Sequence, residues 1–169
     1  MESIERSSSL PISAEAAWAR VVTEQGINDE LAPWLRMTMP KRLRGRTIDD
    51  VAAEVLAGDG ELGRSWILLF GVLPVDYDDL RIVELEPGRS FDERSQTLAF
   101  RVWLHRRTIE PSGPDACRVT DRLGFELRAL PARIPGAARL ARAIVGALFT
   151  HRHRRLRQFA RTRASTMPR

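Results

Sequence analysis

The sequence predicts an α+β fold in which a curved antiparallel sheet wraps around one long C-terminal helix. Between residues 63 and 128 apolar residues alternate with a period of two and every connection is short, which indicates hairpins and therefore antiparallel strands. Residues 136–161 have the apolar periodicity of an amphipathic helix. The chain has 169 residues, the size of one domain, so we expect residues 1–169 to fold as a single domain.

The first part of the chain is expected to hold one strand and two short helices. Residues 3–12 are rich in serine and too polar for a central strand, which favours an edge strand. Ser13 is a typical N-cap residue, and the helix that it begins should run over residues 14–25 and end at Gly26. A second short helix is expected over residues 29–37.

A basic loop over residues 38–47 leads to a third short helix. Thr47 and Asp50 are three positions apart, which is the spacing of a helix-capping pair. We therefore expect a helix over residues 48–56.

Five strands are expected in the middle of the chain, separated by turns rich in proline, glycine and aspartate. They cover residues 65–72, 80–86, 90–94, 99–109 and 117–128. The turn between the first two should lie at residues 74–79, where a proline is followed by three aspartates within five residues.

The C-terminal helix combines an apolar stripe with an arginine-rich end. The stripe consists of Ala137, Ala141, Ile144, Val145, Leu148, Leu156 and Phe159. The opposite face carries Arg139, Arg142, His153 and Arg157. Arg152 and Arg155 fall inside the stripe, so either the last turns extend beyond the core or these arginines have acidic partners. Residues 162–169 are expected to form a flexible tail.

The positive charge of the chain lies at its C-terminal end. The net charge is +5, but residues 133–169 contain ten arginines and no acid, whereas residues 1–132 carry a net charge of −5. Three interpretations stay open for this end: a solvated helix terminus, contact with anionic lipid or nucleic acid, or docking to an acidic protein. The arginines concerned are Arg152, Arg154, Arg155 and Arg157.

Composition and motifs exclude several classes of function. The single Cys117 excludes an intrachain disulfide and a multi-cysteine zinc site. Nucleophile elbows, phosphate-binding loops and zinc-protease motifs are missing from the sequence, so we expect neither a metal nor a cofactor. The longest apolar run has ten residues, about half of a membrane span, and the first residues lack a secretory signal. These features predict a cytoplasmic protein.

Four segments carry a resemblance to a known superfamily. They are residues 12–18 (ISAEAAW), 83–89 (VELEPGR), 116–121 (ACRVTD) and the arginine-rich residues 149–159. With the order of the elements, these segments resemble the START-like, or helix-grip, superfamily, and within it the bacterial polyketide cyclase/dehydrase-like proteins. The resemblance implies a deep pocket for an apolar or aromatic ligand between the sheet and the C-terminal helix. Residues 37–62 look like an insertion that frames or covers the mouth of this pocket.

The pocket that the resemblance implies would be bordered by aromatic and aliphatic side chains. The candidates are Trp66, Phe70, Trp103, Phe125, Ile144 and Leu148. Tryptophan suits such a wall because it offers a broad apolar face with one hydrogen-bond donor. For Trp66 and Trp103, ordinary core packing is the alternative.

One polar pair in the last hairpin is a candidate catalytic pair. If the turn is centred on Gly113, His105 lies opposite Asp121 among apolar side chains, where an imidazole held by a carboxylate can act as a general acid or base. A slip of one residue exchanges the faces, turns Leu104 toward the pocket and pairs Arg106 with Asp121. The sequence leaves both registers open.

Three functions are compatible with these observations. The first is binding of an apolar or aromatic small molecule, such as a lipid or a polyketide. The second is a cyclase or dehydrase activity in which His105 and Asp121 transfer protons. The third is a protein-interacting or RNA-interacting module that uses the arginine-rich helix end.

Overall fold

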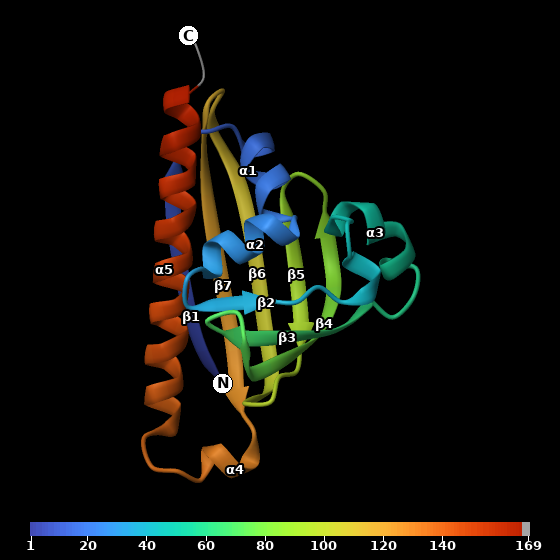
Figure 1. Ribbon diagram of the computed structural model, residues 1–169, viewed down its shortest axis with the longest axis vertical. Coiled ribbons are helices and arrows are strands. Elements are labelled where there is room, and N and C mark those ends of the chain that lie inside the picture. The colour runs from blue at the N-terminus through green and yellow to red at the C-terminus, as the bar shows by residue number, and fades with distance from the viewer. Residues whose placement is uncertain (167–169) are drawn as a thin grey trace.

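Seven antiparallel strands form one curved sheet, and a helix of 30 residues runs along it (Figure 1). The computed structural model describes residues 1–166, without the side chains of residues 52, 53 and 55. The strand order is β1-β7-β6-β5-β4-β3-β2. The elements are β1 (Glu2–Leu10), α1 (Ala14–Val21), α2 (Glu24–Leu31), β2 (Leu35–Met37), η1 (Lys41–Leu43), α3 (Ile48–Leu56), β3 (Glu61–Leu69), β4 (Leu73–Glu86), β5 (Ser90–Ser95), β6 (Phe100–Gly113), β7 (Ala116–Leu127), α4 (Ala129–Ala132) and α5 (Ala137–Thr166).

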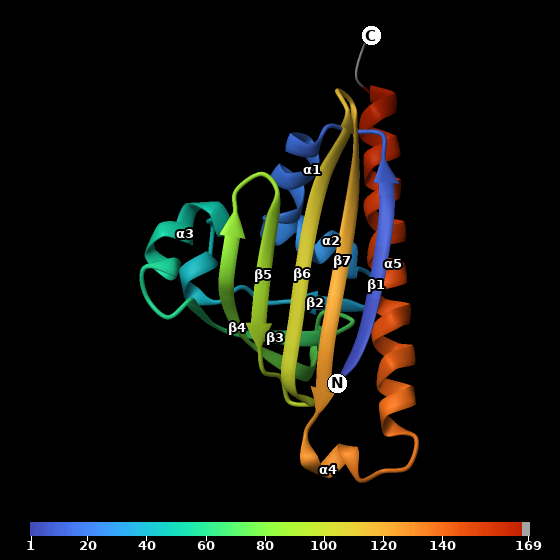
Figure 2. The same ribbon diagram turned by 180° about the vertical axis from the view of Figure 1, so that it is seen from behind.

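The helices α1, α2 and α5 lie on one face of the sheet. Figure 1 shows α5 beside β1 and β7, with α1 and α2 in front of the central strands, and Figure 2 shows the opposite face of the same strands uncovered. The helix α5 packs against β1 and α2. This arrangement confirms the predicted α+β, helix-grip fold.

The two N-terminal helices are divided differently from the prediction. Ser13 is the N-cap of α1, as predicted, and its hydroxyl accepts a hydrogen bond from the Ala16 amide (3.2 Å). The second helix, however, begins at Thr23, whose hydroxyl accepts a hydrogen bond from the amide of Gly26 (3.0 Å). Gly26 is therefore inside the first turn of α2 rather than at the end of α1. A glycine is needed there because a Cβ atom would lie 1.8 Å from the Arg20 carbonyl oxygen.

The turn between β3 and β4 lies earlier than the sequence predicted. It is formed at Phe70 and Gly71, which have positive φ angles of 52° and 76°. Residues 74–79, expected to be a turn, belong to β4, where Asp78 pairs with Ser65 of β3. The acidic run looked like a solvated turn, but alternation along the strand buries the side chain of Asp78.

The register of the β6–β7 hairpin places the odd-numbered residues of both strands toward α5. His105 lies opposite Leu123 and Arg107 lies opposite Asp121. The pairing is shifted by two residues from the one predicted, because the turn is at residues 114–115 and not at Gly113. A shift of two residues keeps the predicted face, whereas the alternative with Arg106 paired to Asp121 is wrong.

The buried face of α5 differs from the predicted stripe. Its buried residues are Val145, Gly146, Phe149, His153, Leu156 and Ala160. Ile144, predicted to face the sheet, has 59% of its surface exposed, and His153, predicted to face solvent, is 3% exposed. Residues 162–166, expected in a flexible tail, continue the helix, and residues 167–169 lie outside the described residues. Within residues 1–166, no helix is both long enough and apolar enough to cross a membrane.

Candidate functional site

An inner cavity of about 120 Å³ lies between the sheet, α5, α2 and the segment 37–62. Its walls are mostly apolar and include Ile27 and Leu31 of α2, Met37, Met39, Leu43 and Ile48 of the segment, Leu80, Ile82 and Phe91 of the sheet, and Trp103, Leu148 and Phe149. Its polar lining is formed by Asp78, Glu93, His105, Arg107 and Arg152. The cavity is therefore an apolar space with a charged side.

Only some of the residues predicted to border a pocket line this cavity. Trp103 and Leu148 do. Phe125 is 1% exposed and packs beside Trp103, its cross-strand neighbour, with ring centroids 6.1 Å apart, so it supports this part of the wall without lining the cavity.

The other three predicted pocket residues lie away from the inner cavity. Ile144 is on the exposed side of α5, Phe70 is in the β3–β4 turn with 61% of its surface exposed, and Trp66 is 46% exposed. Phe70 packs on Trp34, and Trp66 packs on Tyr77, its cross-strand neighbour. The strand neighbour Ile67 lines the cavity instead of Trp66, because adjacent residues of a strand point to opposite faces.

A buried arginine links the sheet to α2. The guanidinium of Arg107 donates two hydrogen bonds of 2.9 Å to the Glu30 carboxylate, and two of 2.7 and 2.8 Å to the Asp121 carboxylate. All three side chains are at most 3% exposed. Arg152 of α5 also donates to Glu30, at 3.0 Å, so for this arginine the second of the two alternatives, an acidic partner, is the one present. Residues from α2, β6, β7 and α5 thus form one charge cluster.

Two histidines complete this cluster. The Nε2 atoms of His105 and His153 each lie 2.9 Å from an oxygen of Asp121, so this carboxylate has four hydrogen bonds. The second nitrogen of His153 contacts the Ser8 hydroxyl at 2.8 Å. The second nitrogen of His105 lies 3.4 Å from Glu93. Both nitrogens of both rings are therefore engaged by the protein.

The environment of the cluster changes the pKa values of its members. Burial by itself would raise the pKa of Asp121, but the charge and hydrogen bonds of Arg107 outweigh it and hold this pKa well below its ordinary value. The same balance, with Arg107 and Arg152, lowers the pKa of Glu30. Burial would lower the pKa of His105, but its hydrogen bonds to Asp121 and Glu93 raise it. The cluster thus favours ionised carboxylates and a protonated His105.

Asp78 and Glu93 form a second carboxyl pair beside this cluster. The pKa of Asp78 is raised well above its ordinary value by burial and by the neighbouring Glu93. The pKa of Glu93 is lowered, because hydrogen bonds to His105 and Ser95 outweigh its burial. Of the two, Glu93 is the carboxylate and Asp78 is the group that retains a proton.

These shifts predict that the free energy of unfolding is highest near about pH 4.5 and falls on both sides of this value. Glu30 and Asp121 have lowered pKa values, so the unfolded chain takes up their protons first, and stability is lost as the pH falls below about 4.5. Asp78 and His105 have raised pKa values, so the folded state holds their protons longer. Stability is therefore lost as the pH rises, from about pH 4 upward for Asp78 and from about pH 6.5 upward for His105. Urea unfolding across pH measures this profile. The variant His105→Gln should flatten its alkaline side, and a stability that instead rises from pH 6.5 to alkaline pH would contradict the assignment.

The sequence analysis identified His105 and Asp121, which the structure places in contact, but missed Arg107, Glu30 and His153. A signal for Arg107 was present: it lies two residues after His105, on the same face of its strand, and faces Asp121. The sequence contained no comparable signal for Glu30. The second helix was predicted over residues 29–37, which placed Glu30 in its first turn, whereas Glu30 lies in the last turn of α2.

The arginine-rich end of α5 mostly faces the protein. Arg152 pairs with Glu30, Arg155 donates to the Asp29 carbonyl oxygen (3.0 Å), and Arg157 donates to the Ser8 hydroxyl (3.1 Å). Of the four arginines predicted to contact anions, Arg154 is the exposed one. Much of the basic character of this end therefore stabilises the packing of α5.

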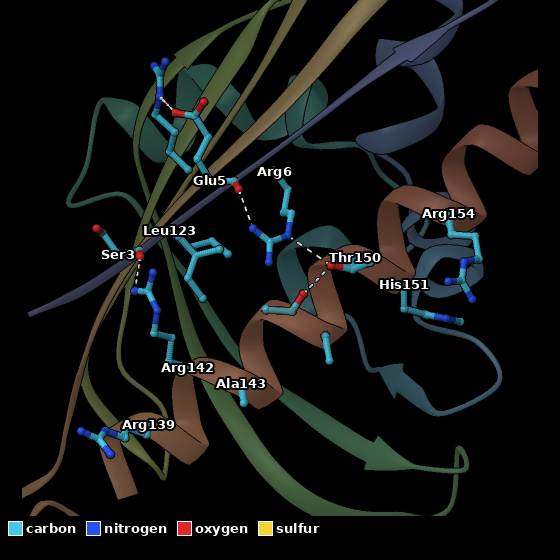
Figure 3. Close-up of a pocket in the computed structure, with 14 residues that line it drawn as sticks. Ser3, Glu5, Arg6, Leu123, Arg139, Arg142, Ala143, Thr150, His151 and Arg154 are labelled. Carbon is cyan, nitrogen blue, oxygen red and sulfur yellow. Dashed lines mark hydrogen bonds and ion pairs between the residues drawn. The ribbon is translucent and has the colours of Figure 1, made fainter. Parts of the chain in front are cut away.

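Arg154 lines an open groove of about 1080 Å³ between β1 and α5 (Figure 3). Its other arginines are Arg6, Arg122, Arg139 and Arg142. Arg142 donates to the Ser3 carbonyl oxygen and Arg6 to that of Glu5, so both arginines cover the backbone of the edge strand β1. Blocking an edge strand with charged side chains is a common protection against edge-to-edge association.

Solved structures of low sequence identity share this fold. A START superfamily protein from Mycobacterium smegmatis aligns with a TM-score of 0.65 at 15% identity, over 95% of this chain and 97% of that chain. The Zhui aromatase/cyclase from Streptomyces sp. R1128 aligns with a TM-score of 0.70 at 13% identity, over 96% and 94%. Truncated norcoclaurine synthase from Thalictrum flavum aligns with a TM-score of 0.59 at 10% identity, over 94% and 92%. These similarities show a START-like helix-grip fold.

The sequence itself identifies a narrower group. No curated protein matches it at a significant level. Residues 8–160 match the family described as "Domain of unknown function (DUF8410)". This match covers most of the chain, and the protein therefore belongs to the DUF8410 family.

Proposed function

We propose that the protein binds a small aromatic or apolar molecule in the inner cavity. The observation that carries this proposal is the lining: an apolar wall contributed by α2, the segment 37–62, the sheet and α5, with charged groups on one side. Ligand sites in proteins commonly have this composition, with a few polar groups that orient the ligand. The aromatase/cyclase and the norcoclaurine synthase named above have the same fold, which supports a ligand site without assigning its ligand.

The size of the cavity narrows the ligand class. Sites for drug-sized molecules have volumes of about 300–1,000 Å³, whereas this cavity has about 120 Å³. An apolar cavity of about 150 Å³ in another protein accommodates benzene. The present conformation therefore suits a molecule of about one aromatic ring, and a lipid or polyketide would require α5 or the segment 37–62 to move outward.

A proton-transfer enzyme that uses His105 and Asp121 is the second candidate. Its support is the buried 2.9 Å contact between the two side chains. A general base, however, needs a ring nitrogen with a free lone pair in reach of the substrate. His105 has a carboxylate at each nitrogen, and its pKa is raised by these two contacts despite burial. This geometry favours a role in which a charged His105 holds the neighbouring carboxylates in place. Ligand binding is therefore better supported than proton transfer by His105.

Filling the cavity with a larger side chain should weaken ligand binding. Fluorobenzene, observed by fluorine NMR, is a probe of suitable size. Leu148→Trp introduces a larger ring at the cavity wall and should weaken fluorobenzene binding at least about tenfold, which corresponds to about 1.4 kcal/mol. Leu140→Trp is the matched control, because Leu140 lies eight residues earlier on the same helix and is 63% exposed. Equal loss in both variants, or unchanged binding in Leu148→Trp, would place the ligand elsewhere.

A further inference from the structure

The carboxyl pair of Asp78 and Glu93 lies at the polar side of the inner cavity and is incompletely satisfied. Glu93 accepts a hydrogen bond from the Ser95 hydroxyl (2.9 Å) and lies 3.4 Å from His105. Asp78 is only 6% exposed, and its Oδ1 atom has no hydrogen-bond partner among the described residues. The buried hydroxyl of Ser65, opposite Asp78 on β3, also has no partner in the described residues.

His105 lies beside Glu93, but the other cations of the site are directed away from this carboxyl pair. Arg107 contacts Glu30 and Asp121, and Arg152 contacts Glu30. Within residues 1–166, no arginine, lysine or histidine forms an ion pair with Asp78. The Asp78 side of the cavity is therefore the side where a buried oxygen needs a donor and where a positive charge is missing.

We propose that Asp78 and Glu93 recognise a cationic amine, so that the ligand class of the inner cavity is a small aromatic amine. This inference rests on the proposed function and specifies the substrate class of the same cavity. An ammonium group supplies three donors, which can reach Asp78 and Glu93 together. Charge-assisted hydrogen bonds of this kind are about twice as strong as neutral ones. The apolar wall formed by Leu80, Ile82 and Phe91 would hold the ring.

The protonation of the free protein is consistent with this assignment. Burial and the charge of Glu93 raise the pKa of Asp78, which favours its protonated form where a neighbouring cation is missing. When an ammonium group binds, Asp78 can release this proton to solvent and become a carboxylate, so the charge of the site stays balanced. A ligand carboxylate would instead face two acidic side chains and would be repelled.

Three probes of similar shape test the proposal on the unmodified protein: toluene, benzyl alcohol and benzylamine, each titrated at neutral pH and followed by protein NMR. We expect benzylamine to bind at least about tenfold more tightly than toluene, with benzyl alcohol between them, because a hydrogen bond to a charged group contributes more than a neutral one. Asp78→Asn should reduce the preference for benzylamine to below about threefold while toluene affinity stays within about twofold. Asp79→Asn is the matched control: its side chain is 43% exposed and pairs with Arg64 on the outer face, so the preference should persist.

The outcomes separate this inference from the proposed function. Equal affinities for toluene and benzylamine would overturn the inference but leave the cavity as an apolar binding site. Tighter binding of benzyl alcohol than of benzylamine, or an unchanged amine preference in Asp78→Asn, would overturn it as well. If none of the three probes binds, the proposed function fails and the inference with it.

Discussion

Replacing Arg107 by methionine is expected to lower the free energy of unfolding by about 3–5 kcal/mol. The guanidinium of Arg107 satisfies both Glu30 and Asp121, which are at most 3% exposed. Methionine fills a similar volume but leaves two buried carboxylates without their main cation. Urea unfolding of the variant at neutral pH measures the loss.

Arg106→Met is the matched control for this experiment. Arg106 is the preceding residue of the same strand, and its side chain is 44% exposed and pairs with Asp92 at the surface. Exposed ion pairs of this kind contribute about 0–1 kcal/mol. A similar loss in both variants would mean that the buried cluster does not stabilise the fold in the way described.

Phe149→Ala should cost about 3–5 kcal/mol, the second large effect. Phe149 is 1% exposed and packs edge-to-face on His105, with ring centroids 5.2 Å apart, while the Arg152 guanidinium lies 4.8 Å from the centre of its ring. Truncation removes these contacts and opens a larger space between α5 and the sheet. Thermal or urea unfolding gives the magnitude.

Ile144→Ala provides the comparison on the same helix. Because Ile144 is 59% exposed, its truncation should change stability by less than about 0.5 kcal/mol. The pair of variants therefore measures which face of α5 packs on the sheet. A larger loss for Ile144→Ala than for Phe149→Ala would favour the stripe that the sequence predicted over the one in the structure.

Elements with a local signal could be predicted from the sequence. The Ser13 cap and the helix over residues 48–56 have side-chain to backbone contacts within three residues, and both are present as predicted. Alternation of apolar residues also indicated the strands of the β6–β7 hairpin, although it left open which face of β6 carries His105. These patterns depend on near neighbours, which a single sequence contains.

Features that depend on distant partners could not be predicted in the same way. Asp78 looked like part of a solvated turn because its neighbours are acidic, and only the pairing of β4 with β3 shows that it is inside. His153 looked exposed because its neighbours are arginines, yet its partners Ser8 and Asp121 lie on β1 and β7. A charge cluster assembled from α2, the sheet and α5 has no local signature.

The residues predicted to border the pocket also show which features a single sequence can and cannot predict. Trp103 lines the inner cavity, as one of the two registers left open by the sequence predicts. Trp66 was assigned by residue type, but it lies outside because Ile67, one residue later, has the inward position. In a strand, a shift of one residue is enough to exchange a pocket wall for an exposed surface.

The most direct measurement of the central claim is a titration of the protein with toluene, followed by the methyl resonances in NMR spectra. Binding in the inner cavity predicts shifts concentrated on methyl groups of its wall, such as those of Ile27, Leu80 and Ile82. The methyl groups of Leu140 and Ile144, on the exposed side of α5, should stay unchanged. Shifts confined to these exposed residues, or no saturable shift at any methyl group, would contradict a ligand site between the sheet and α5.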